Sequence, residues 1–157
     1  MIKETEVVDP ITYERQPDGG KTPIIDPYDG CQLCCPYCWQ LSDENWNRNI
    51  YVNINIADLL KDRLASWDKK ETVYLGSRCD PYMQIEKKYS LTRKCLSVLN
   101  ELRINTMITT KSDNVLIFRD IDSVRAGHAF AAVNIFKNVL YGDFQPILVL
   151  FFVLYDV

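Results

Sequence analysis

Short apolar runs alternate with amphipathic stretches along the first two thirds of the chain. Residues 22–26, 71–77 and 104–110 are rich in β-branched and aromatic side chains, which predicts three strands. Residues 56–67 predict a helix whose apolar face carries Ile56, Leu59, Leu60, Leu64 and Trp67. A clearer helix follows Ser90, the expected N-cap, with apolar positions at Leu91, Cys95, Val98, Leu99 and Leu102. Another helix is expected to open at Asp113.

Strands that alternate with helices imply βαβ crossovers, and therefore an α/β protein with a parallel sheet. In such sheets the chemistry gathers at the carboxyl ends of the strands. The first predicted strand leads to a group of cysteines, the second to residues 78–82 (RCDPY) and the third to residues 111–113 (KSD). We expect these three polar clusters to meet on one face. After about Asp122 the pattern of alternating strands and helices is no longer recognisable, and residues 123–157 carry no motif.

The length of the chain limits the architecture. With 157 residues and 47% hydrophobic residues, the chain has an ordinary globular composition. A globule of this size buries roughly 70% of its extended-chain surface, which is enough for one core. It is also short of the ~250 residues of a complete (β/α)8 barrel, so any barrel would be incomplete. We therefore expect one domain.

Charge and hydropathy limit the setting. The net charge of −3 and pI of about 5.2 show no electrostatic footprint of tight nucleic-acid binding. Residues 1–8 contain Lys3, Glu4 and Glu6 and lack the apolar core of a signal peptide. The longest apolar run, residues 147–155, falls short of the ~20 residues of a membrane span; it is expected to be a buried strand or an aggregation-prone end. These features predict a cytoplasmic protein with no membrane partner.

The cysteines are strongly clustered: Cys31, Cys34, Cys35 and Cys38 lie within one short segment. Reduced thiols in a cluster suggest metal rather than disulfides. Cys31, Cys35 and Cys38 form C-x3-C-x2-C, which suits an iron–sulfur cluster or zinc. A structural zinc site needs four ligands, usually from two separated pairs, and no second pair follows. The spacing favours iron–sulfur over zinc or unmetallated thiols, because three thiolates on a cubane leave one iron open.

Several motifs in order resemble a known family. Residues 29–38 (DGCQLCCPYC) resemble the signature loop of radical S-adenosylmethionine (radical SAM) enzymes. Residues 80–86 (DPYMQIE), 91–93 (LTR), 110–113 (TKSD) and 119–122 (RDID) resemble the spore photoproduct lyase-like branch, also labelled DNA repair photolyase-like. The resemblance covers about residues 20–122. It implies that residues 1–122 are the N-terminal half of a partial (β/α)6 TIM-like barrel with about three βα units, and that residues 123–157 are a diverged or aberrant C-terminal tail of the same domain.

The resemblance also implies an activity, which is that of a lyase-like enzyme. Cys31, Cys35 and Cys38 would hold a 4Fe-4S cluster, and S-adenosyl-L-methionine would bind the open iron and be cleaved reductively to a 5′-deoxyadenosyl radical. An electron donor such as flavodoxin or ferredoxin would be a partner, and DNA is the implied substrate. Tyr37 would lie near the adenine. By position, Asp80 would contact the cofactor's ammonium and Lys111 its carboxylate, and the pairing of opposite charges supports both roles.

Each site residue also has a purely structural interpretation. Tyr37 would then pack against the cluster or the barrel, and Lys111 would be a solvated charge. Asp80 precedes Pro81 and would be a turn residue. Glu86 begins a charged run and is equally well interpreted as a surface ion-pair partner.

The remaining cysteines and the single histidine complete the set. The resemblance implies that Cys79 is a hydrogen-atom donor, whereas its position suggests a small thiol at a strand end. Cys95 is expected in the core, Cys34 is expected to be a bystander among the ligands, and His128 is expected to be structural or exposed. Two alternatives for the whole chain stay open: a non-catalytic truncated iron–sulfur-binding fragment and a zinc-stabilised interaction module.

Overall fold

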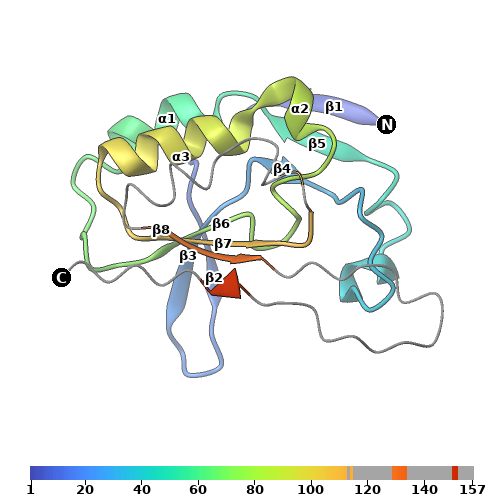
Figure 1. Cartoon of the computed structure of the whole chain (residues 1–157), viewed down its shortest axis with the longest axis horizontal. Coiled ribbons are helices and arrows are strands. Elements are labelled where there is room, and N and C mark those ends of the chain that lie inside the picture. The colour runs from blue at the N-terminus through green and yellow to red at the C-terminus, as the bar shows by residue number, and fades with distance from the viewer. Residues whose placement is uncertain (113, 115–128, 134–149, 152–157) are drawn as a thin grey trace.

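The computed structural model describes residues 1–112, 114, 129–133 and 150–151, and its main feature is a six-stranded sheet (Figure 1). The strand order is β2-β3-β6-β7-β8-β9, in which β3, β6, β7 and β8 run parallel while β2 and β9 are antiparallel to their neighbours. The strands are β2 (Thr12–Arg15), β3 (Lys21–Ile25), β6 (Val73–Leu75), β7 (Thr106–Thr110), β8 (Ala129–Val133) and β9 (Leu150–Phe151).

Helices cover one face of this sheet. Figure 1 shows α1 (Ile56–Arg63) and α3 (Leu91–Glu101) side by side above the strands, with α2 (Glu86–Tyr89) leading into α3. Between the layers lies the main core, to which the strands contribute Ile25, Val73, Leu75 and Ile108, the helices contribute Ile56, Leu60, Cys95, Leu96 and Leu99, and the turn after α1 contributes Leu64. Each large apolar side chain that is fully buried contributes about 1.5–3 kcal/mol. This packing holds the carboxyl ends of β3, β6 and β7 in a common position.

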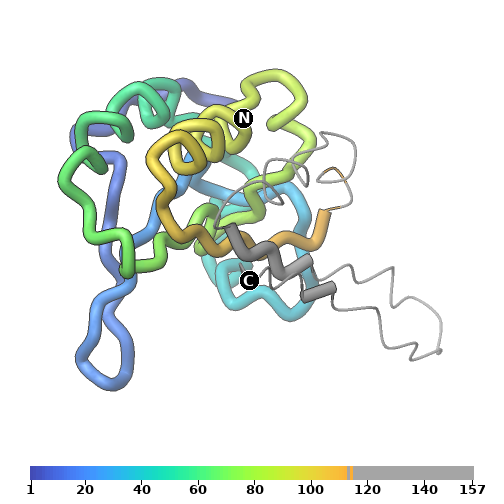
Figure 2. The backbone as a smooth tube through the Cα atoms, turned by 60° about the vertical axis from the view of Figure 1, so that its left-hand side comes forward, coloured from blue at the N-terminus to red at the C-terminus, as the bar shows by residue number. Residues whose placement is uncertain are grey.

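A second, smaller sheet supports the start of the cysteine-rich loop. Its order is β1-β5-β4, made of β1 (Ile2–Thr5), β5 (Ile50–Asn53) and β4 (Tyr28–Asp29). Its buried side chains join a second core formed by Tyr28, Ile50, Val52, Cys79, Met83, Ile85 and Leu91. A 3-10 helix, η1 (Trp39–Ser42), follows the cysteines. Figure 2 shows that the β2–β3 hairpin extends away from the rest of the molecule.

The three strands predicted from apolar runs are present as β3, β6 and β7, each close to its expected bounds. The predicted helix over residues 56–67 ends early, at Arg63, because Leu64 closes the last turn and the chain leaves the helix axis. The structure adds β1, β2, β4 and β5, which are short. The helix expected at Asp113 and His128 lie outside the described residues.

The barrel remains a prediction. In the part of the chain that the structure describes, the large sheet is open, with β2 and β9 at its edges. Of the tail from residue 123 onward, only β8 and β9 are described, and both join this sheet. The apolar run at residues 147–155 is described only at β9. Among the described residues, no helix is long and apolar enough to cross a membrane.

The predicted N-cap of α3 is confirmed in position, but the side chain of Ser90 does not make the capping hydrogen bond. Ser90 stands at the N-cap position with a φ of 52° and makes no side-chain cap hydrogen bond. The carboxylate of Glu86 accepts the N–H groups of Thr92 and Arg93 instead, at 3.1 and 3.2 Å. It also accepts the hydroxyl of Tyr28. The left-handed turn at Ser90 folds α2 back over the start of α3, so Glu86 reaches the free N–H groups of that helix.

Glu86 is therefore a structural residue of the second core. It is 0% exposed, which contradicts the interpretation as a surface ion-pair partner. Burial raises the pKa of its carboxyl above the usual value, although the hydrogen bonds from Tyr28, Thr92 and Arg93 oppose this rise. Negative charge at a helix N-terminus is favourable, so the start of α3 helps to stabilise the buried carboxylate of Glu86. The motif Asp80–Glu86 thus ends in a residue that joins β4 to α3.

Candidate functional site

A pocket of about 120 Å³ opens where the cysteine-rich loop meets the carboxyl ends of β6 and β7. All three polar clusters expected from the sequence contribute to it, so their predicted convergence is confirmed. The loop supplies Cys31, Leu33, Cys35 and Cys38, the segment after β6 supplies Gly76 to Asp80, and the end of β7 supplies Thr109, Thr110 and Lys111.

Gly30 sets the direction in which the cysteine-rich loop leaves β4. Its φ is +91°, and a Cβ at this position would lie 2.2 Å from the carbonyl oxygen of Asn49 and 2.9 Å from that of Trp46. The next residue, Cys31, donates its N–H to the same Trp46 carbonyl at 3.1 Å. A side chain at position 30 would therefore collide with the backbone that closes the loop, and only glycine fits.

The loop is fastened to the segment that follows β6. The N–H of Gln32 donates to the sulfur of Met83 at 3.1 Å, and the side-chain oxygen of Gln32 accepts the N–H of Ile85 at 3.3 Å. Met83 is fully buried in the second core. The motif Asp80–Glu86 is thus the platform on which the cysteines are mounted.

The predicted metal ligands share the pocket. Cys31, Cys35 and Cys38 are half-buried and line it, whereas Cys34 is exposed and lies outside this lining. Cys34 has a φ of 49°, and its sulfur accepts the side-chain amide of Asn47 at 3.5 Å. This placement agrees with the interpretation of Cys34 as a bystander.

The cofactor stays a prediction. Among the described residues, no group of three or more His, Cys, Asp and Glu side chains is arranged to hold a metal ion. Cys31, Cys35 and Cys38 line one pocket, and a 4Fe-4S cluster would bind each thiolate through a different iron. Burial raises the pKa of the Cys31 thiol, and the nearby charges of Asp80 and Cys35 add to the rise. A bound metal would have to displace this proton, since thiolate is the ligand form.

Asp80 joins the end of β6 to the end of β7. One oxygen accepts the N–H of Tyr82 at 2.9 Å and the hydroxyl of Thr110 at 2.8 Å, and the other accepts the N–H of Lys111 at 2.6 Å. Burial raises the pKa of Asp80, and these three hydrogen bonds oppose the rise. A carboxylate offers about four acceptor positions, so one remains for a ligand such as an ammonium group. The turn interpretation is correct, and the cofactor contact stays a prediction.

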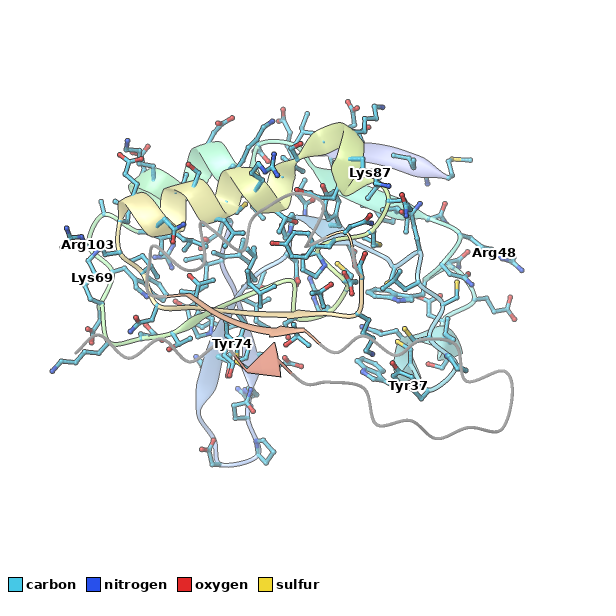
Figure 3. The ribbon with its side chains drawn as sticks, viewed as in Figure 1. Tyr37, Arg48, Lys69, Tyr74, Lys87 and Arg103 are labelled. Carbon is cyan, nitrogen blue, oxygen red and sulfur yellow. The ribbon has the colours of Figure 1, made fainter. Side chains whose placement is uncertain are left out.

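Lys111 lines the pocket and contacts Tyr37, which lies outside the lining. The ammonium of Lys111 lies 4.3 Å from the centroid of the Tyr37 ring. Burial lowers the pKa of Lys111, but the hydrogen bond to Tyr37 and the neighbouring Cys35 and Cys38 outweigh it and raise the pKa overall. Tyr37 is 56% exposed, and Figure 3 shows it on the loop at the edge of the molecule. The two residues predicted to bind adenine and carboxylate are therefore neighbours.

Cys79 lies at the buried end of the pocket. It is 5% exposed, and its thiol donates to the carbonyl oxygen of Tyr28 at 3.0 Å. Burial raises its pKa well above the usual value, and the charges of Asp26 and Cys31 add to the effect. The sulfur therefore keeps its hydrogen at neutral pH, which both the donor role and the structural role require. Cys95 lies in the main core, as predicted.

Sequence reasoning missed the partner of Arg78. Its Nε donates to Asp26 at 2.8 Å, and its backbone N–H donates to the other carboxylate oxygen at 3.4 Å. Arg78 stood in one of the expected clusters, but nothing in the sequence signalled a pair 52 residues apart. Asn114 was missed as well: it is buried, and its side-chain amide donates to the Tyr82 carbonyl at 2.9 Å.

Comparison with known proteins finds uncharacterized relatives. An uncharacterized protein of Methanocaldococcus jannaschii is 32% identical over 133 residues, which cover 78% of this chain and 48% of that protein. Uncharacterized proteins of Mycobacterium tuberculosis and Mycobacterium bovis are each 28% identical over 130 residues, which cover 76% of this chain and 37% of theirs. The chain thus spans about half the length of the first relative. No family model and no solved structure matches it.

Proposed function

We propose that the chain is a radical SAM protein of the spore photoproduct lyase-like type, which binds a 4Fe-4S cluster and cleaves S-adenosylmethionine reductively. One observation carries the proposal. The thiols of Cys31, Cys35 and Cys38 line the same pocket as Asp80 and Lys111, at the carboxyl ends of parallel strands. Soft sulfur ligands and two opposite charges are thereby offered to one ligand, which is what a cluster with an amino-acid-bearing cofactor needs. The resemblance of residues 29–38 to the radical SAM loop supports the same assignment.

The side chains of the protein would bind the cofactor and orient it. When bound, the cluster and its cofactor supply one-electron reduction and a 5′-deoxyadenosyl radical, and the protein supplies orientation and electrostatics. Asp80 would use its remaining acceptor position for the cofactor ammonium, since Tyr82, Thr110 and Lys111 hold the carboxylate in place. Lys111 would pair with the carboxylate.

Two further residues would act beside the cofactor. Tyr37, which is exposed and contacts the pocket-lining Lys111, would lie near the adenine. Cys79 would hold a transferable hydrogen beside the cofactor, because burial keeps its thiol protonated.

The setting of the protein follows from the same chemistry. Thiols that serve as cluster ligands must stay reduced, which favours the cytoplasm and a flavodoxin or ferredoxin as the electron donor. DNA is the substrate that the resemblance implies. The net charge of −3 offers no independent support for it.

Anaerobic reconstitution with iron and sulfide tests the proposal. We expect the absorption and electron paramagnetic resonance spectra of a 4Fe-4S cluster, a change in them on adding S-adenosylmethionine, and release of 5′-deoxyadenosine under reduction. A cluster that gives neither response would support the non-catalytic iron–sulfur-binding alternative. Bound zinc without iron after native purification would overturn the proposal in favour of the zinc module.

A pair of adjacent cysteines provides the matched control. Cys35→Ala should abolish cluster binding, because this sulfur lines the pocket, whereas Cys34→Ala should spare it, because this sulfur lies outside the lining. Iron and sulfide content per chain is the measurement. Equal loss in the two variants would refute the ligand assignment.

A further inference from the structure

Arg78 is held in the pocket wall by a buried carboxylate behind it. The side chain of Asp26 is 5% exposed, and its carboxylate accepts hydrogen bonds from both the Nε and the backbone N–H of Arg78. The side chain of Arg78 is 47% exposed. Within the described part of the chain, the ion pair of Arg78 uses Nε alone. The two terminal amino groups of the guanidinium are therefore left for a second anion, and they form a flat fork that binds oxyanions through two parallel hydrogen bonds.

Hydroxyl groups stand on the same rim of the pocket. Ser77 precedes Arg78 after β6, and Thr109 lies near the end of β7; both line the pocket and both are exposed. The buried end of the pocket carries a thiol and a carboxylate instead of hydroxyl groups, since Cys79 and Asp80 lie there. The pocket thus has a thiol-lined interior and an outer rim of hydrogen-bond donors supplied by two neighbouring strands.

Lys111, the second cation of the pocket, is not part of this rim. Lys111 contacts the Tyr37 ring, and its backbone N–H donates to Asp80. It is therefore grouped with the residues assigned above to the cofactor. Arg78 is grouped with Asp26, and Asp29 is the other carboxylate near it. The two cations serve different parts of a bound ligand.

We propose that Ser77, Arg78 and Thr109 form a subsite for a phosphate group of the substrate. A carboxylate is planar, and the guanidinium fork takes both of its oxygens in one plane. A phosphate is tetrahedral and can accept the fork on one side and hydroxyl donors from a second strand on the other. That this phosphate belongs to the substrate rests on the function proposed above, whereas phosphate binding by Arg78 is a property of the chain alone. A phosphorylated small molecule and a nucleic-acid backbone share this chemistry.

Calorimetric titration of the full chain tests the subsite with inorganic phosphate as the first probe. Arg78→Gln should weaken phosphate binding by roughly tenfold or more, because it removes charge-assisted hydrogen bonds. Arg78→Lys should recover only part of the affinity, since an ammonium cannot form the fork. Arg103→Gln is the matched control, because Arg103 lies at the opposite end of the molecule from Tyr37 in Figure 3. If Arg78→Gln fails to fold with Asp26 unpaired, the double variant with Asp26→Asn replaces it.

Two further arms identify the source of the phosphate. Glycerol phosphate represents a phosphomonoester, and a short single-stranded oligonucleotide represents a nucleic-acid backbone; the tighter of the two, if weakened by Arg78→Gln, identifies the source. Phosphate affinity that is unchanged in Arg78→Gln would overturn the proposal. Acetate binding as tightly as phosphate, with the same dependence on Arg78, would replace phosphate by carboxylate.

Reconstitution of the same variants separates this inference from the proposed function. Phosphate binding that depends on Arg78 in a chain that takes up no cluster would leave the subsite in place and refute the radical SAM assignment. A cluster that responds to S-adenosylmethionine, in a chain whose phosphate affinity is the same in wild type and Arg78→Gln, would refute the subsite alone.

Discussion

Asp80→Asn separates the structural role of this residue from its proposed cofactor contact. The asparagine amide can keep its oxygen where two donors converge, those of Tyr82 and Thr110. Its NH2 group then faces the N–H of Lys111, so one buried donor loses its partner, which costs about 1–3 kcal/mol. The two retained hydrogen bonds are weaker without the charge, while removal of a desolvated carboxylate offsets part of the loss. We expect the free energy of unfolding to fall by about 2 kcal/mol.

The assay compares urea unfolding with S-adenosylmethionine affinity. Thr110→Val is the matched control, because it removes one donor to Asp80 but leaves the carboxylate in the pocket. It should lower stability by about 1 kcal/mol and reduce cofactor affinity much less than Asp80→Asn does, because the carboxylate keeps its charge and its other two donors. Asp80→Asn should weaken cofactor binding in addition. Wild-type stability in Asp80→Asn would refute the anchoring role, and wild-type cofactor affinity would refute the contact.

The pH dependence of stability gives an independent check on Asp80. Its folded-state pKa is raised above the usual 3.8, so the folded state binds a proton more tightly than the unfolded state. The contribution of Asp80 to stability is therefore fully present below the unfolded pKa and is lost as pH rises through the folded pKa. Asp80→Asn lacks this contribution, and its unfolding free energy should change less between pH 3 and neutrality than that of the wild type. Parallel pH profiles would contradict the raised pKa.

Two further substitutions test the scaffold of the site. Glu86→Gln should lower the unfolding free energy by about 1–3 kcal/mol, because the amide can keep its oxygen for Tyr28 and Thr92 but then turns its NH2 group toward the N–H of Arg93, whereas Ser90→Ala should stay within about 0.5 kcal/mol. A larger effect of Ser90→Ala in urea unfolding would restore serine as the cap. Gly30→Ala should cost more than about 2 kcal/mol and abolish cluster binding, because a Cβ would collide with the Asn49 carbonyl. A folded Gly30→Ala chain with full iron content would show that the loop tolerates a side chain there.

Local patterns were sufficient for the elements that carry the site. Apolar runs located β3, β6 and β7, and a helical apolar period located α3, because these signals lie within one element. The end of α1 was placed too late because Leu64 and Trp67 continue the apolar pattern beyond the helix and pack on the core from a turn. The strands β1, β2, β4 and β5 were missed, since short strands such as the two-residue β4 carry almost no period. Their pairing depends on neighbours elsewhere in the chain.

The sequence by itself determined the spacing of Cys31, Cys35 and Cys38, and it predicted their meeting with Asp80 and Lys111, because parallel strands bring their carboxyl ends to one edge. Only the tertiary structure decided how the charged side chains are used. Glu86 caps α3 beneath Tyr28, Asp80 joins β6 to β7, and Asp26 orients Arg78. These partners lie far apart in sequence, and a buried polar group pairs with whichever donor or acceptor packing brings within reach. The residue types that give the site its chemistry could therefore be recognised from local sequence. The separation of its two cations, Lys111 beside Tyr37 and Arg78 beside Asp26, was decided by packing.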